Sequence, residues 1–284
     1  VPAAQLLRLS ERGAEVRYSG LLDIAVLCDE PPVVRSGRLT VERLFDLQKL
    51  PFGNRCLEID GSLTLSKLPV ENLQEVRTLR RVAGSFRIRQ NVQLLEISAL
   101  ASLSEVTGDL QITDNPVLES LDGLGALGTV GGRLQILNNP ELTDLGSFDN
   151  FGQANGIVIS GNPNLQTLAG LEALEQVLGT VVLGGAGVTS LEGLHNLRTI
   201  QAGILSITNN PVLTDLRGLR GLETVSGGFT IRSNANLQTL AGLDPGRVGG
   251  RIVIENNPRL SSTAVDDFRD RLRQRGFDGA FINR

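Results

Sequence analysis

The sequence predicts a right-handed β-helix, a solenoid of about nine coils with a parallel sheet and a cap at each end. The first observation is a repeat of 23 to 25 residues that runs from about Gly61 to Leu260. The second is that every copy holds two apolar residues separated by one position, the pattern of a strand with one buried face. The third is that only about 15 residues separate consecutive strand segments, so each repeat has room for one coil. At a strand spacing of ~4.8 Å, such a rod would be about 40 Å long.

Residues 1–55 contain no copy of the repeat and are predicted to form an N-terminal cap. Within this cap, residues 40–47 have the pattern of a short amphipathic helix, with Thr40 as a candidate N-cap. Residues 56–260 are then expected to form the solenoid, and residues 261–284 a C-terminal cap.

Each copy of the repeat contributes one predicted strand. A glycine usually stands two residues before the first apolar residue of the strand, and Asn155 takes this place in the fifth coil. Glycine and asparagine tolerate a positive φ best, so a turn with that backbone geometry is expected there. The apolar pairs of the nine predicted strands are Leu63/Leu65, Phe86/Ile88, Leu110/Ile112, Leu134/Ile136, Ile157/Ile159, Val181/Leu183, Leu205/Ile207, Phe229/Ile231 and Ile252/Ile254.

An asparagine follows three residues after most of these strands, often with a proline behind it. Stacked in register, the side-chain amides are expected to bond to the turn backbone and to the asparagine of the next coil. The sixth coil has Gly184-Gly185-Ala186-Gly187 instead, which predicts a local irregularity or a close backbone approach. The predicted ladder consists of Asn91, Asn115, Asn139, Asn162, Asn210, Asn234 and Asn257.

Apolar residues recur at every third position after the asparagine turn. The third coil shows this with Leu118, Leu121, Leu124, Leu127 and Val130. A period of three fits neither a long α-helix nor a strand, so a winding, partly 3₁₀-like return segment is expected.

The C-terminal cap is predicted to be a helix followed by a last strand. Thr263 with Asp266 resembles a capping box, and Gly276 stands where a helix ends. Val265, Phe268 and Leu272 form the stripe that would cover the open end of the solenoid. The final strand is expected within residues 277–282.

Charge and hydropathy exclude two classes of partner. The formal net charge of −4 gives no electrostatic reason to expect nucleic acid binding. No run of 18 apolar residues occurs, so no membrane span is expected in this chain.

The repeat Gly-x-Leu-x-Ile-x-x-Asn-Pro-x-Leu, seen from Gly132 to Leu142, resembles the receptor L domain. This is the β-helical, leucine-rich-repeat-like module in the ectodomains of the insulin and epidermal growth factor receptor families. The resemblance covers roughly residues 28–284. The coils here are more numerous and more uniform, and the cysteine-rich module that follows in the receptors is missing. The chain is therefore most similar to bacterial secreted or surface versions, and receptor ligands do not carry over.

The resemblance implies a disulfide between Cys28 and Cys56, because in that family one cysteine precedes a short helix and a second opens the first strand. Such a bond would tie the cap to the first coil, stabilise the fold by roughly 3 kcal/mol and imply an oxidising compartment. Two buried thiols remain the alternative.

No residue pattern indicates catalysis, a metal or a cofactor. His195 is the single histidine, so no zinc set and no nucleophile–base pair can be assembled around it. The carboxylates Glu119, Asp144, Glu192 and Asp215 follow the repeat spacing, which favours a solvated edge over the convergent acids of a glycoside hydrolase.

The outward row of the strands contains a candidate binding patch near coils four to six. It is composed of Leu137, Val158, Val182, Gly184 and Ile204. Exposed apolar strips often mark contacts. The alternatives are cover by the N-terminal segment and ordinary β-branched strand surface.

These observations favour a non-catalytic, secreted or cell-surface binding module, with a bacterial periplasm or outer surface as one setting. Its rigid sheet would present side chains to a protein or carbohydrate partner. A structural spacer in a larger envelope protein is the alternative, and a polysaccharide-acting β-helix enzyme is third. The oligomeric state does not follow from the sequence.

Overall fold

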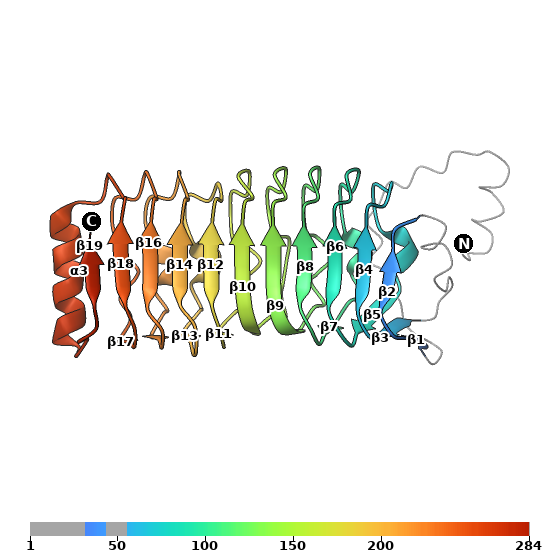
Figure 1. The fold of residues 1–284 in the computed structure, drawn as a ribbon, viewed down its shortest axis with the longest axis horizontal. Helices are drawn as coiled ribbons and strands as arrows, with labels where there is room; N and C mark the ends of the chain where they lie inside the picture. Colours follow the sequence, from blue (N-terminus) through green and yellow to red (C-terminus); the bar gives the residue numbers. More distant parts are fainter. Residues whose placement is uncertain (1–31, 44–55, 284) are drawn as a thin grey trace.

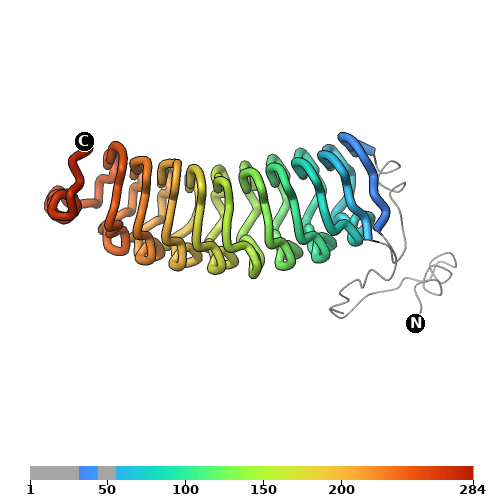
Figure 2. The backbone as a smooth tube through the Cα atoms, turned by 90° about the horizontal axis from the view of Figure 1, so that it is seen from below, coloured from blue at the N-terminus to red at the C-terminus, as the bar shows by residue number. Residues whose placement is uncertain are grey.

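The computed structural model describes residues 32–43 and 56–283, and it forms a parallel β-solenoid of about nine turns. The coils follow one another along a single axis, and the C-terminal helix closes one end (Figure 1). Seen from below, consecutive coils stack side by side as a gently bowed rod (Figure 2). The predicted fold class is confirmed in this form.

The main sheet runs along the whole rod and carries all nine predicted apolar pairs, while β2 and β19 add a strand at either end. Every pairing in it is parallel, and equivalent residues of successive coils are in register, as between Leu110 and Leu134. Its strands are β2 (Leu39–Val41), β4 (Leu63–Ser66), β6 (Phe86–Arg89), β8 (Leu110–Thr113), β9 (Thr129–Leu137), β10 (Gln153–Ser160), β12 (Val181–Gly184), β14 (Leu205–Thr208), β16 (Phe229–Arg232), β18 (Ile252–Glu255) and β19 (Phe281–Asn283).

A second row of parallel strands precedes the main strands in each coil, and the sequence analysis did not predict it. Most of these strands have only two residues, and all of these short strands except β17 have one buried apolar residue, such as Val106 or Val177. In β9 and β10 one continuous strand passes through both rows (Figure 1). The separate strands of this row are β1 (Val33–Ser36), β3 (Leu57–Asp60), β5 (Leu79–Val82), β7 (Glu105–Val106), β11 (Gln176–Val177), β13 (Thr199–Ile200), β15 (Thr224–Val225) and β17 (Arg247–Val248).

The sheet begins before the predicted boundary at residue 56. Strand β1 pairs with β3, and β2 pairs with β4. Thr40 and Val41 therefore lie in a strand, so the prediction of a helix that starts at Thr40 is wrong; residues 44–47 lie outside the described ranges. Gly37-x-Leu39-x-Val41 has the same glycine–apolar–apolar spacing as the repeat and could have revealed this coil. The asparagine turn that marks most of the other copies does not follow Val41.

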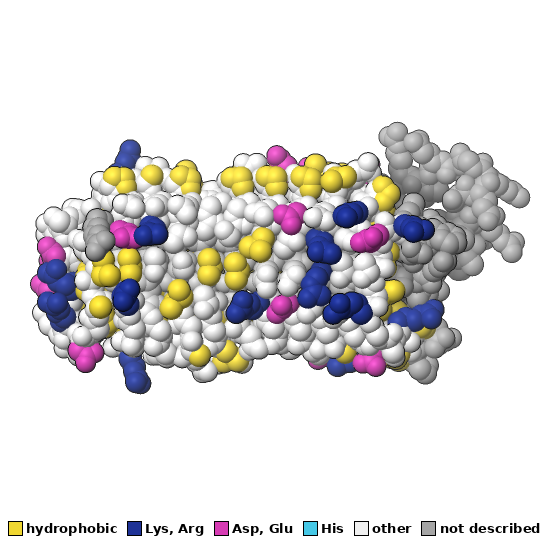
Figure 3. Space-filling view, viewed as in Figure 1, with side chains coloured by type: hydrophobic (Ala, Val, Ile, Leu, Met, Phe, Trp, Pro, Cys, Tyr) yellow, Lys and Arg dark blue, Asp and Glu magenta, His cyan; other side chains and the backbone are white. Residues whose placement is uncertain are grey.

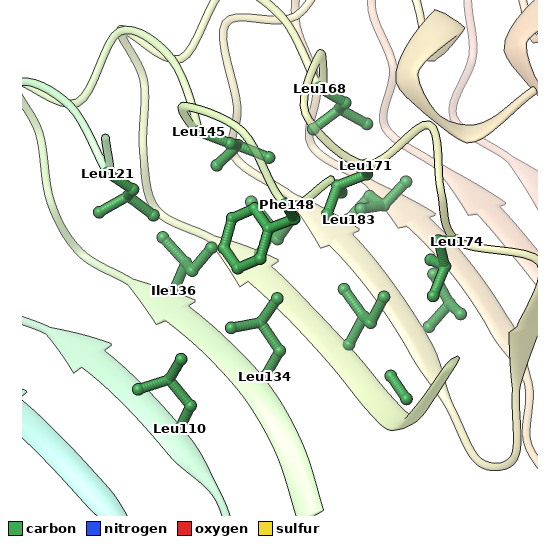
Figure 4. Close-up of a cluster of buried hydrophobic side chains, with 14 of the residues drawn as sticks. Leu110, Leu121, Leu134, Ile136, Leu145, Phe148, Leu168, Leu171, Leu174 and Leu183 are labelled. Atoms are coloured by element: carbon green, nitrogen blue, oxygen red, sulfur yellow. The ribbon is translucent and has the colours of Figure 1, made fainter. Parts of the chain in front are cut away.

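The core is one continuous column of aliphatic side chains from the strands and the return segments. Leu134 and Ile136 of β9 point toward Leu145 and Phe148 from the opposite wall (Figure 4). Phe148 and Phe151 have ring centroids 5.6 Å apart and fill one wide coil. The expected 3₁₀ geometry is confirmed in η1 (Gln74–Val76), η2 (Ser98–Leu100), η3 (Glu192–Leu194) and η4 (Arg217–Leu219).

The glycines before the main strands have a different role from the expected one. In the series from Gly61 to Gly250, only Gly61 has a positive φ, so the prediction of a positive-φ turn is wrong for the others. Their backbones stack too closely for a side chain instead. A Cβ on Gly108 would lie 2.7 Å from the carbonyl carbon of Gly84. Glycine is needed here because consecutive coils touch.

The C-terminal cap is α3 (Ser262–Gln274), with Val265, Phe268 and Leu272 buried as predicted. The N-cap is Ser261, whose Oγ accepts from the Ala264 N–H at 3.1 Å, so the prediction of a Thr263–Asp266 capping box is wrong. Gly276 ends the helix with a φ of 90°, as expected. The last strand is confirmed as β19.

Candidate functional site

The predicted asparagine ladder is confirmed as a column of buried, mutually bonded amides. Asn139 is typical: its Oδ1 accepts from the backbone N–H and from Nδ2 of Asn115, both at 3.1 Å. Its own Nδ2 donates to the carbonyl of Ile112 at 3.0 Å. Each amide therefore joins neighbouring coils and satisfies a backbone group that the turn leaves unpaired.

The ladder is interrupted in the sixth coil. Ala186 occupies the asparagine position and is buried, and its N–H still donates to Oδ1 of Asn210 at 3.1 Å. Alanine has no amide to offer to Asn162 in the coil before. The side-chain bonds thus run from Asn91 to Asn162 and start again at Asn210.

The residue before each ladder position adopts the left-handed conformation, which the sequence analysis missed. Examples are Gln90, Asp114 and Ser233, with φ of 57°, 58° and 56°. The left-handed geometry aims the following asparagine inward. The sequence signal for this conformation is an asparagine at this position in three coils, because asparagine tolerates the left-handed region; these residues are Asn138, Asn209 and Asn256.

The structure brings only part of the predicted binding patch together. Val158 and Val182 are direct register neighbours on β10 and β12, and both are half-buried. Ile204 lies one coil further, two residues before Ser206, the register partner of Val182, and is 43% exposed. Gly184 is buried, and Ser160 separates it from Leu137 in the neighbouring row. The apolar strip therefore consists of Val158, Val182 and Ile204, and we call it the valine strip.

Charged groups lie further toward the N-terminal end of the same face, where β8 and β9 separate them from the valine strip. Arg87 and Arg89 project from β6, and Arg87 Nε donates to Gln111 at 3.1 Å. The space-filling view of this face shows many basic side chains over the first coils, and hydrophobic side chains in the middle, along the upper edge and near the C-terminal end (Figure 3). The valine pair thus lies between the polar residues Gln135 and Ser206 of the same row, and a second apolar pair, Val253 and Ile282, lies at the C-terminal end of the row.

The residues considered for catalysis lie apart in structural roles. His195 caps η3, with Nδ1 2.5 Å from the carbonyl oxygen of Glu192. Asp144 accepts from Ser120 at 2.8 Å, and Asp215 accepts from the N–H of Arg217 at 2.9 Å. In the described part of the chain, no group of three or more histidine, cysteine or acidic residues could hold a metal ion.

Two arginines have perturbed ionisation, both through ion pairs. The pKa of Arg81 is raised by its hydrogen bond to Glu105, at 2.8 Å, in the next coil. The pKa of Arg275 is raised by its hydrogen bond to Asp244, at 2.7 Å, which fastens α3 to the last coils. Both ion pairs connect one element of the fold to another, so we assign them a structural role.

Cys56 is buried directly before β3, whereas Cys28 lies outside the described residues. The disulfide between them stays a prediction. None of the described helices has the length and apolar character needed to cross a bilayer.

The chain matches no protein-family model, and a search of curated protein sequences finds no significant match.

Proposed function

We propose that this chain is a non-catalytic binding module of the receptor L domain type, exposed outside the cell, that docks a protein through the valine strip. The observation that carries the proposal is the direct pairing of Val158 with Val182 between two polar register neighbours, Gln135 and Ser206. Apolar side chains at the centre of a contact, with a polar rim, are the usual anatomy of a protein–protein interface.

The rigidity of the sheet supports the same proposal. Val158 and Val182 are held by continuous parallel ladders on both sides, so their positions are fixed before a partner arrives. A preorganised surface loses little conformational entropy on binding. The strip has no aromatic ring or charged group of its own, which favours an apolar protein segment over a glycan.

The test compares charge substitutions inside and outside the strip. The double variant V158D/V182D should lose the envelope proteins that the immobilised wild-type chain captures, because an ionised carboxylate opposes an apolar contact. Thr230→Asp, on the same outward row, is the matched control and should capture them like the wild type. Circular dichroism checks that all variants fold. Identical capture by V158D/V182D and the control would reject the proposal.

A structural spacer is the second candidate, and the uninterrupted rod with a helix over one end is the observation that favours it. A spacer needs length but no particular surface. In that case V158D/V182D would leave function intact, whereas deletion of one whole coil would impair it.

A further inference from the structure

A second, different surface lies on the row of short strands. A hollow of about 560 Å³ opens over the first halves of β9 and β10 and over β11. Its volume is in the range of small-ligand sites. Its polar wall is made by Thr129, Gln153, Asn155, Glu175 and Gln176. None of these residues belongs to the valine strip.

The strand register places three of these side chains in one line. Gln153 is in register with Gln176, and Ala154 is in register with Val130, which sets Gln153 beside Thr129. Successive coils in such a sheet lie ~4.8 Å apart. The line therefore presents a hydroxyl and two primary amides at regular intervals along the rod.

The same row carries charges on both sides of the hollow. Arg81 and Glu105 form an ion pair at 2.8 Å in the coils before Thr129, and Arg247 lies in β17 beyond Thr224. From Thr129 to Thr224 the row has only uncharged hydrogen-bonding side chains. The first three residues of this uncharged stretch, Thr129, Gln153 and Gln176, line the hollow.

The amides of this stretch are available to a ligand. The side chains of Thr129, Gln153 and Gln176 make no hydrogen bond to another described residue. Other amides on the surface do bond to a neighbouring coil: Asn196 Nδ2 donates to the carbonyl oxygen of Glu172 at 2.8 Å. Each free glutamine amide offers donors and acceptors together.

A backbone irregularity lies beside the hollow. Strand β9 has one more residue than β10 between their paired positions, a bulge at Gly131 and Gly132. Bulges commonly stand beside binding sites because they redirect the backbone. Gly131 and Gly152 both line the hollow; a Cβ on Gly152 would meet only the carbonyl oxygen of Ala173 at 3.6 Å, whereas one on Gly131 would clash with the carbonyl oxygen of Thr107.

From this arrangement we infer that the hollow binds a neutral oligosaccharide that lies along the rod axis. A sugar hydroxyl both donates and accepts, which matches amide and hydroxyl side chains in a row. The hollow has no cationic lining residue, and Glu175 adds a carboxylate, so anionic sugars are disfavoured. Glu175 instead accepts from sugar hydroxyls.

Calorimetric titration of the full chain tests this, with the neutral hexaoses maltohexaose, cellohexaose, laminarihexaose, mannohexaose and xylohexaose, and with galacturonate hexamer as the anionic comparator. At least one neutral hexaose should bind, and the galacturonate hexamer should not. Co-sedimentation with the matching insoluble polysaccharides shows whether the protein also binds internal segments of a long polysaccharide.

The variant Q153A/Q176A should weaken binding by about tenfold or more. Gln135→Ala removes a glutamine from the main-sheet half of β9 and should bind the sugar like the wild type. The inference is overturned if no neutral hexaose binds, or if Q153A/Q176A binds as tightly as Gln135→Ala. The variant V158D/V182D should keep full sugar binding, so loss of the protein contact and loss of the sugar site are separate results.

Discussion

Oδ1 of Asn139 accepts two hydrogen bonds from Asn115 of the preceding coil, from its backbone N–H and from its side-chain Nδ2. A single buried oxygen thus joins two coils through main chain and side chain at once. Repeated along the rod, this relationship makes each coil depend on the one after it.

Replacement of Asn139 by alanine should lower the free energy of unfolding by roughly 3 kcal/mol, because the N–H of Asn115 and the carbonyl of Ile112 lose their buried partners. Urea denaturation followed by circular dichroism measures this. Asn164→Ala is the control, since Asn164 is exposed and makes one long bond to Glu141 at 3.4 Å. Equal stabilities of the two variants would show that the ladder contributes little.

Ala186→Asn should stabilise the protein by about 1 kcal/mol, because the new amide would complete the interrupted ladder between Asn162 and Asn210. The thermal midpoint reports the change. Ala186→Leu introduces a side chain of the same branched shape without an amide and should destabilise the buried position. A midpoint for Ala186→Asn at or below that of the wild type would contradict the prediction.

Gly108→Ala should destabilise the solenoid by about 3 kcal/mol, because the added Cβ would lie 2.7 Å from the backbone of Gly84 and Ser85 and the coils would have to separate. Gly246→Ala is the matched control, since its Cβ would lie 3.6 Å from the carbonyl oxygen of Glu223, an ordinary contact. Chemical denaturation of both variants decides. If Gly108→Ala were as stable as its control, close stacking would not be the reason for the glycine column.

Oxidised protein should gain the mass of two hydrogen atoms on reduction, as expected for a Cys28–Cys56 bond. Intact-mass spectrometry with and without reductant measures this. The reduced protein should lose roughly 3 kcal/mol of stability through the larger entropy of its unfolded chain. An unchanged mass after reduction would reject the bond.

The nine main strands and the asparagine ladder could be predicted because each leaves a repeated, local signal, such as Leu134, Ile136 and Asn139 in one coil. The second strand row could not, because a strand such as β7 shows one buried apolar residue, Val106. The reason for glycine at positions such as Gly108 depends on the distance between coils, which no local pattern records. Thr129 and Gln153 likewise look like ordinary surface residues until the register sets them side by side.

The alanine that stands at position 186 in place of a ladder asparagine also affects how the solenoid unfolds. In a solenoid, cooperativity is carried only by contacts between adjacent coils. The junction between the coils of Asn162 and Ala186 is missing one amide that the other junctions along the ladder have. We expect the rod to behave as two blocks joined at that seam, with amide hydrogen exchange near residues 160–187 faster than in the neighbouring turns. The seam runs through the coils of Val158 and Val182, so a partner docked there would hold the two blocks together.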